Sequence, residues 1–153
     1  MNISENIKKI HEEVTTWRHE LHANPELCYE ENWTAEFIAE KLKSFGIEVH
    51  NKIGKTGVIG VLKGSNSQEH KSNRSIGLRA DMDALPIEEE NDFDYKSKFL
   101  GKMHACGHDG HVAMLLGAAK ILSREKKFSG TVYFIFQPAE EGVGGGLKMI
   151  NDG

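Results

Sequence analysis

The spacing of apolar residues predicts two amphipathic helices at the start of the chain. In the first, an apolar residue recurs every three or four positions, at Ile7, Ile10, Val14, Trp17 and Leu21. This spacing places the five side chains on one face of a helix, and Pro25 should end it. A second helix is predicted over residues 31–45, with Gly46 as its C-terminal stop. We expect the histidines of the first helix to lie on its solvated face or at its edges: His11, His19 and His22.

Short apolar and β-branched runs predict four strands, at residues 47–50, 57–62, 75–80 and 131–136. In the last run the apolar residues do not alternate with polar ones, which is typical of a central strand covered on both faces. A helix over residues 111–122 is apolar over most of its surface and should be buried. The predicted fold is therefore α/β, a three-layer αβα arrangement with a mainly parallel or mixed sheet.

Two stretches lack the periodicity of a helix or strand. Residues 64–73 are polar and rich in turn-forming residues, which indicates a surface loop. Residues 84–103 are charged and form a long connection, and a loop of this length in a compact domain is usually functional or mobile.

Composition narrows the class of protein. The 153 residues suffice for one domain, and a net charge of -4 gives no argument for binding to nucleic acid or to an anionic membrane. The longest strongly apolar run, residues 132–136, is too short to cross a bilayer. Two cysteines are too few for a disulfide framework. We therefore expect a reduced, cytoplasmic protein without nucleic-acid or membrane partners.

The stretch from Met103 to His111 has the composition of a metal site. Cys106 and His108 lie two positions apart, so a thiolate and an imidazole can reach one ion if the backbone turns between them. Gly107 permits this close approach because it has no Cβ atom. Zinc and similar divalent ions bind this mixture of ligands. The alternative is a polar turn whose histidines and cysteine share no function.

A pair of carboxylates follows the most apolar strand. Glu140 and Glu141 come directly after the predicted central strand and Pro138. Adjacent side chains on an extended backbone point in different directions, so one carboxylate can bind an ion while the other faces a water molecule. Metal-assisted hydrolysis needs this combination of Lewis acid and general base. The alternative is that both are ordinary solvated charges.

Asp81 and Asp83 follow another predicted strand, where a carboxylate can orient a metal-bound histidine or cap the next turn. If the strands at 75–80 and 131–137 are parallel neighbours, their carboxyl ends bring the two aspartates, the Cys106–His108 stretch and the glutamate pair together.

Four ordered segments resemble one family. They are His22-Ala-Asn-Pro-Glu-Leu27, Arg79-Ala-Asp-Met-Asp-Ala-Leu-Pro-Ile87, the stretch from Met103 to His111, and Gln137-Pro-Ala-Glu-Glu-Gly142. In this order the chain resembles the M20 metallopeptidase family in its amidohydrolase branch. That branch includes aminoacylase-like enzymes, hippurate hydrolases, N-acetyldiaminopimelate deacetylases and indole-acetyl-amino-acid hydrolases.

The resemblance implies a site with two divalent metal ions that cleaves the amide bond of small-molecule N-acyl amino acids. Zinc, manganese and cobalt are all compatible with it. By motif, Cys106, His108 and Glu141 would be metal ligands, and Glu140 would be the general base. Asp83 matches a supporting acidic position, and Asp81 is a further candidate. For His111 we expect packing or a hydrogen bond to a metal ligand.

The resemblance also implies parts that these residues do not supply. Family members have two further histidine ligands downstream and an inserted lid or dimerisation domain. The only histidines after Cys106 are His108 and His111. We therefore expect residues 1–153 to form the N-terminal part of a catalytic domain, whose full-length form can be a homo-oligomer. The alternatives are a non-catalytic metal-binding module and an inactive fragment.

Overall fold

Four strands form one mixed sheet, and the most apolar strand lies in its interior. The computed structural model describes residues 3–65, 74–142 and 144–153. The strands are β1 (Glu48–Ile53), β2 (Gly57–Lys63), β3 (Ser75–Asp81) and β4 (Thr131–Gln137), in the spatial order β1-β2-β4-β3. β4 is therefore an interior strand, as its continuous apolar run predicts.

The pairing of the strands is both antiparallel and parallel. β1 pairs with β2, and β2 with β4, in antiparallel orientation. β3 and β4 are parallel neighbours, in a register that runs from Ser75 opposite Thr131 to Asp81 opposite Gln137. The expected mixed sheet is confirmed. The carboxyl ends of β3 and β4 therefore meet at one edge of the sheet.

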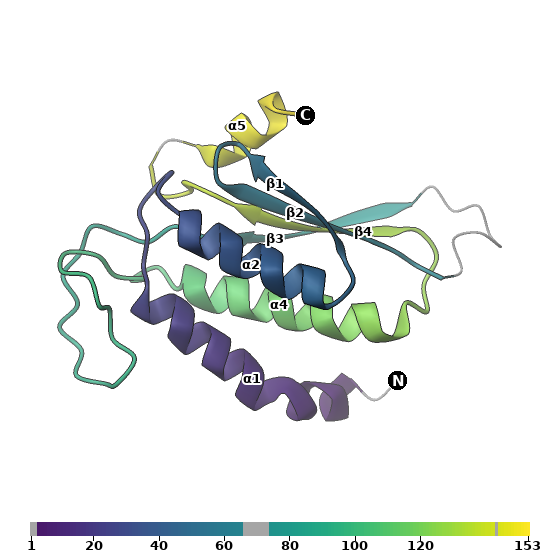
Figure 1. Ribbon diagram of the computed structural model, residues 1–153, viewed down its shortest axis with the longest axis horizontal. Helices are drawn as coiled ribbons and strands as arrows, with labels where there is room; N and C mark the ends of the chain where they lie inside the picture. Colours follow the sequence, from purple (N-terminus) through teal and green to yellow (C-terminus); the bar gives the residue numbers. More distant parts are fainter. Residues whose placement is uncertain (1–2, 66–73, 143) are drawn as a thin grey trace.

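The helices lie mainly on one face of this sheet. Figure 1 shows α2 (Asn32–Ser44) and α4 (His108–Glu125) directly beneath it, with α1 (Ile3–Ala23) packed outside α4. The short α5 (Gly145–Asn151) lies on the other side of the sheet. The α/β class is confirmed, and helices border both faces of the sheet unequally.

The core fills the space between the sheet and the helices. Its fully buried members include Leu21 of α1, Leu42 of α2 and Phe134 of β4. The expectation that the helix over residues 111–122 is buried is wrong at Met114. Ile7 and Met114 are exposed, because α1 and α4 face each other over only part of their surfaces and leave an open apolar groove at one side.

The helix α4 begins three residues earlier than its apolar pattern predicts. Gly107 precedes it with a φ of 90°, a left-handed backbone that favours glycine. A Cβ atom at this position would meet no other atom within 4 Å, so backbone conformation rather than space favours glycine here. His108 therefore lies in the first turn of α4, which fixes the direction of its side chain.

The long connection before α4 is held against α1 by specific contacts. It contains no helix or strand, but an isolated bridge joins Leu85 to Met103 and brings its two ends together. The ring of Tyr95 stacks on His19 of α1 at 3.7 Å. The backbone N–H of Lys98 donates to the carbonyl oxygen of Ala23 at 3.0 Å. Residues 66–73, most of the predicted surface loop at 64–73, lie outside the described residues.

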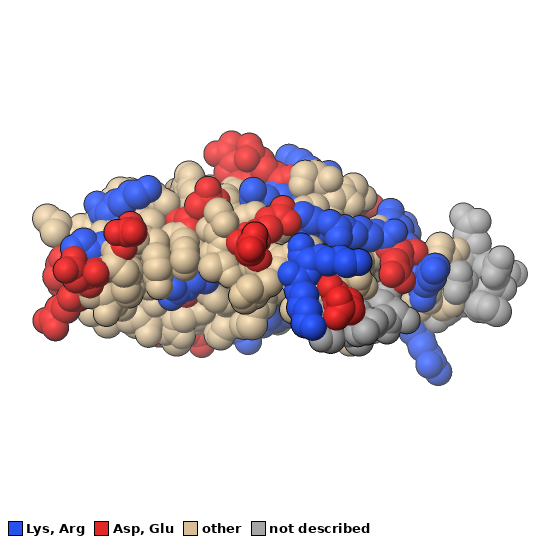
Figure 2. Space-filling model, turned by 90° about the horizontal axis from the view of Figure 1, so that it is seen from below, with Lys and Arg blue, Asp and Glu red and all other residues tan. Residues whose placement is uncertain are grey.

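The face that carries α1 combines charged and uncharged surface. Figure 2 shows Lys and Arg side chains gathered on its right half and intermixed with Asp and Glu, while uncharged residues cover much of the left half. Among the described residues, no helix is both long enough and apolar enough to cross a membrane.

Candidate metal centre

The structure brings together the three side chains that the sequence singles out as metal ligands. One ligand atom each from Cys106, His108 and Glu141 lies within 4.8 Å of the other two. A zinc ion bonds to sulfur at ~2.3 Å and to nitrogen or oxygen at ~2.0–2.2 Å, so atoms this close can share one ion after small side-chain rotations. The expected convergence of the three side chains is therefore observed.

Two strand ends and a helix start create this convergence. Directly after β3, the N–H of Met82 donates to the carbonyl of Gln137, the last residue of β4, at 2.9 Å, which keeps the two segments adjacent at the ends of the strands. The N–H of Glu141 then donates to a carboxylate oxygen of Asp83 at 2.9 Å. Since β3 and β4 are parallel, both chains leave the sheet at the same edge and turn toward the first turn of α4.

His108 is buried and held in one orientation. Its Nδ1 atom lies 2.9 Å from the carbonyl oxygen of Asp83 and 3.3 Å from the Oδ1 atom of the same residue. With Nδ1 as the donor, Nε2 is free to accept, and it faces Glu140 at 3.8 Å and Glu141 at 3.9 Å. The hydrogen bond with Asp83 raises the pKa of His108, although burial opposes it. Nε2 is therefore the atom available to a cation.

Asp83 holds His108 and the backbone of Glu141 in place. It is buried, and burial alone would raise the pKa of its carboxyl group. Hydrogen bonds with His108, the Glu141 N–H and the Cys28 thiol outweigh burial and lower the pKa to about 2. The carboxyl group is therefore a carboxylate at neutral pH and fixes both a predicted ligand, His108, and the backbone of another, Glu141.

The cluster fits a divalent cation. The Oε1 atom of Glu141 is buried and has no hydrogen-bond partner within the described part of the chain, which is costly for a carboxylate oxygen. The neighbouring Glu141 carboxylate, together with desolvation, raises the pKa of the Cys106 thiol to about 11. A thiol, an imidazole nitrogen and an unsatisfied carboxylate oxygen at one point form a donor set that a zinc-like ion would complete.

Glu140 differs from its neighbour in exposure. Its side chain is 40% exposed, against 21% for Glu141 and 3% for His108. Glu140 is not one of the three converging ligands, yet its Oε2 atom lies 3.8 Å from His108 Nε2. It therefore faces solvent at the rim of the cluster, where it can reach a water molecule.

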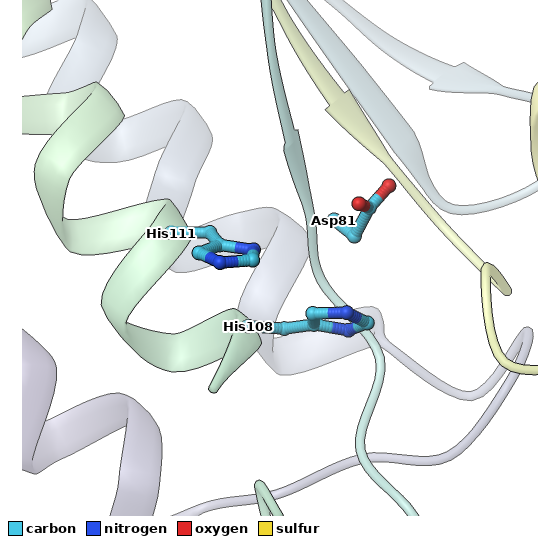
Figure 3. A group of neighbouring side chains, drawn as sticks. All are labelled: Asp81, His108 and His111. Carbon is cyan, nitrogen blue, oxygen red and sulfur yellow. The ribbon is translucent and has the colours of Figure 1, made fainter. Parts of the chain in front are cut away.

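The remaining predicted site residues, Asp81 and His111, lie at the outer side of His108. Figure 3 shows His108 and His111 extending from the first turns of α4 toward Asp81 at the end of β3. One ligand atom from each of the three lies within 4.8 Å of the others. Asp81 is already paired with Arg79, at 2.6 and 2.9 Å. His111 is exposed, and the centroid of its ring lies 5.5 Å from that of His108, so the expectation of packing or a hydrogen bond to a metal ligand stays a prediction.

A second buried polar cluster joins α1, α4 and the long connection, and no pattern in the sequence predicts it. His22 was expected on the solvated face of its helix or at the edges of that face, but it is buried, with 2% of its surface exposed. Its Nδ1 atom lies 2.6 Å from Asp109, and its Nε2 atom lies 2.9 Å from Glu89. Arg18 contacts the same Asp109 oxygen at 3.0 Å. These partners are 67 and 87 residues from His22, so no local pattern could indicate them.

His104 lies between the two clusters. It is buried, and neither ring nitrogen has a hydrogen-bond partner among the described residues. Burial lowers its pKa to about 4, so the ring is neutral at pH 7. The ring of His22 lies 6.5 Å away.

The chain is similar to known proteins over the segments that form this cluster. The model of peptidase family M20/M25/M40 matches residues 77–153, which include Asp83, the Cys106–His108 stretch and the glutamate pair. A hippurate hydrolase of Campylobacter jejuni is 52% identical over 153 residues, which are 100% of this chain and 38% of that protein. An N-acyl-L-amino acid amidohydrolase of Geobacillus stearothermophilus is 49% identical over 95% of this chain and 40% of its own length.

A solved structure shows the same fold. The Bacillus subtilis YXEP protein, described as a dinuclear metal binding peptidase from the M20 family, superposes with a TM-score of 0.86. It is 41% identical, over 95% of this chain and 40% of that one. The chain thus spans about two fifths of the length of these relatives. With the family model matching half of its residues, the chain belongs to peptidase family M20/M25/M40.

Proposed function

We propose that this chain carries the metal centre of a metal-dependent amidohydrolase that cleaves the amide bond of N-acyl amino acids. One observation carries the proposal. The donor atoms of Cys106, His108 and Glu141 converge within 4.8 Å, beside a second carboxylate, Glu140, that stays exposed to water. A structural metal site has no use for such a neighbouring base, whereas hydrolysis needs one.

Each residue of the site would have a distinct role in binding the ion or moving the proton. Cys106, His108 through Nε2, and Glu141 would hold a divalent ion. Asp83 would keep the His108 ring and the Glu141 backbone in place. When bound, the ion supplies a Lewis acid that lowers the pKa of water and polarises a carbonyl group. Glu140 would take the proton from the attacking water and pass it to the departing amine nitrogen, so that an acid and an amine leave.

The donor set leaves several metals open. A thiolate ligand favours zinc, while two carboxylates are compatible with manganese and cobalt. The dinuclear site of the B. subtilis YXEP protein supports a second ion beside the first. Both cysteines are free thiols, which agrees with the cytoplasmic location that forms part of the proposal.

A chimeric enzyme tests the proposal. Residues 1–153 would replace the matching 153 residues of the C. jejuni relative, and the chimera would be assayed on N-acetyl and N-benzoyl amino acids. We expect hydrolysis that a chelator abolishes and that zinc, manganese or cobalt restores, with the unaltered relative as the control. A folded chimera that binds metal and hydrolyses none of these substrates would contradict the proposal and favour a non-catalytic metal-binding module.

A further inference from the structure

The connection between α1 and α2 reaches the back of the metal centre, although it supplies none of the proposed ligands. The Cys28 thiol donates to a carboxylate oxygen of Asp83 at 3.2 Å. Three residues later, Glu31 extends toward the turn that carries the glutamate pair. Both side chains come from the segment that continues the His22–Leu27 motif, which the proposed chemistry leaves without a role.

Glu31 joins three parts of the fold through one carboxylate. It is fully buried at the start of α2. Its Oε2 atom accepts a hydrogen bond from the hydroxyl of Thr56, between β1 and β2, at 2.6 Å. Its Oε1 atom accepts one from the backbone N–H of Ala139, which follows β4, at 2.9 Å. Burial raises the pKa of Glu31, whereas these two bonds favour its charged form.

The Ala139 turn needs such support. Ala139 is fully buried and has a φ of 51°, a left-handed backbone that is costly for a residue with a Cβ atom. Without Glu31, its N–H would be buried with no acceptor, which adds a further penalty. The carbonyl of Ala139 accepts from the N–H of Gly145 at 3.2 Å, so both the N–H and the carbonyl of the strained residue are hydrogen-bonded. Glu140 and Glu141 come next in the chain, and their directions depend on this turn.

The side chain of Glu31 does not cap the helix whose start the residue occupies. It is the N-cap residue of α2 but makes no side-chain capping bond. Glu26 performs that function, since its carboxylate accepts from the N–H groups of Trp33 at 3.1 Å and Thr34 at 2.8 Å. The side chain of Glu31 is thus directed toward Thr56 and Ala139 and caps no N–H group of α2.

We propose that Glu31 is a positioning residue for the Glu140–Glu141 pair, holding the Ala139 amide so that one glutamate faces the ligand cluster and the other faces water. Its consequence for metal binding rests on the proposed function, but its effect on the turn does not. Glu26 offers a matched control, because it is a carboxylate of the same segment that contacts a helix start instead of the turn.

Hydrogen exchange of the Ala139 amide tests the positioning directly. In Glu31→Met, which keeps the volume but accepts no hydrogen bond, we expect this amide to exchange at least about tenfold faster. Glu31→Gln keeps an acceptor and should restore slow exchange. Glu26→Ala should lower the urea midpoint of unfolding and leave Ala139 exchange unchanged. Unchanged Ala139 exchange in Glu31→Met would overturn the proposal.

Cobalt binding to the same variants tests the consequence at the metal centre. Absorbance of the Cys106 thiolate bound to Co²⁺ would report affinity, and we expect Glu31→Met to lose ~10–100-fold while Glu31→Gln and Glu26→Ala stay near the wild type. A wild type that binds no cobalt contradicts the proposed metal centre, while Ala139 exchange still decides the role of Glu31. If Glu31→Met does not fold, Thr56→Val decides: a smaller acceleration at Ala139 supports the proposal, and none overturns it.

Discussion

At the scale of single residues, Glu140 and Glu141 are chain neighbours with different surroundings. Glu141 Oε1 is buried among the proposed ligands, while the Glu140 side chain is 40% exposed. We therefore predict that Glu140→Gln, made in the chimera with the C. jejuni relative, lowers turnover by ~10²–10⁴-fold because the proposed general base is lost. Its metal content, measured by atomic absorption, should stay near that of the unsubstituted chimera.

Glu141→Gln is the matched control for that substitution. The same chemical change one residue later should remove a ligand, so the protein should lose metal and activity together. If Glu140→Gln loses its metal while Glu141→Gln keeps it, the roles of the two glutamates are reversed.

The sequence predicts residues whose chemistry is grouped locally and misses those whose partners are distant. Cys106 and His108 are separated by one glycine, so their joint reach toward an ion follows from spacing alone. Glu31 and Ala139 are 108 positions apart, and nothing in the local sequence distinguishes a buried glutamate from a solvated one. The burial of His22 could not be predicted for the same reason, since only tertiary packing buries a histidine at the edge of a helix face.

At the scale of elements, helices and strands were predictable in type, and less so in their ends and pairing. The second helix was predicted over 31–45 and covers Asn32–Ser44. The strand predicted at 47–50 is the longer β1, Glu48–Ile53, because its last residues are held by pairing with β2 rather than by an apolar pattern. The antiparallel pairing of β2 with β4 joins strands that are far apart in sequence, and no local signal sets its direction.

The His22 cluster ties α1 and α4 to the long connection between β3 and α4, and its strength should depend on pH. Asp109 faces one ring nitrogen of His22 and Glu89 the other, so only the protonated ring donates to both. The hydrogen bond to Asp109 raises the pKa of His22, and that to Glu89 adds to it, although burial opposes both. A pKa that is higher in the folded state means that this stabilisation is full below the unfolded-state pKa of about 6.5 and is lost as pH rises through the folded-state pKa.

Urea unfolding of wild type and His22→Gln at several pH values measures this effect. Taking the difference between the two proteins removes the contribution of the other histidines. We predict that wild type exceeds His22→Gln by ~1–3 kcal/mol in unfolding free energy at pH 6, since charge-assisted hydrogen bonds are lost. The difference should shrink as pH rises toward 9. A difference that is constant over this range would mean that the pKa of His22 is the same in the folded and unfolded states.

At the scale of the whole molecule, apolar surface lies open on the outer side of β3 and α4. Ile76 of β3 is 56% exposed and Met114 of α4 is 63% exposed. β3 has β4 on one side and is an edge strand of the described sheet. Exposed edges and apolar patches of this kind promote association, so a polypeptide of residues 1–153 should be studied at low concentration with its oligomeric state monitored.

The number of metal-binding donors in the whole molecule limits the chemistry that the 153 residues can perform by themselves. Two clusters of three donors exist among the described residues, but both contain His108, and Asp81 in the second is already paired with Arg79. The clusters therefore cannot hold two ions independently, and catalytic zinc sites generally use three protein ligands for each ion. The relatives have chains about two and a half times as long, which leaves room for further ligands.

We therefore predict that residues 1–153, purified alone and supplied with zinc or manganese, hydrolyse N-acetyl and N-benzoyl amino acids far below the ordinary enzyme range of ~1–10³ per second. One cobalt ion per chain should still bind at Cys106, because that donor set is complete enough for a single ion. The chimera with the C. jejuni relative, measured in the same assay, separates missing ligands from a defect in these residues: it should be active where the isolated chain is not. Turnover within the ordinary range by the isolated, monomeric chain would show that one ion, held by Cys106, His108 and Glu141, suffices for the reaction.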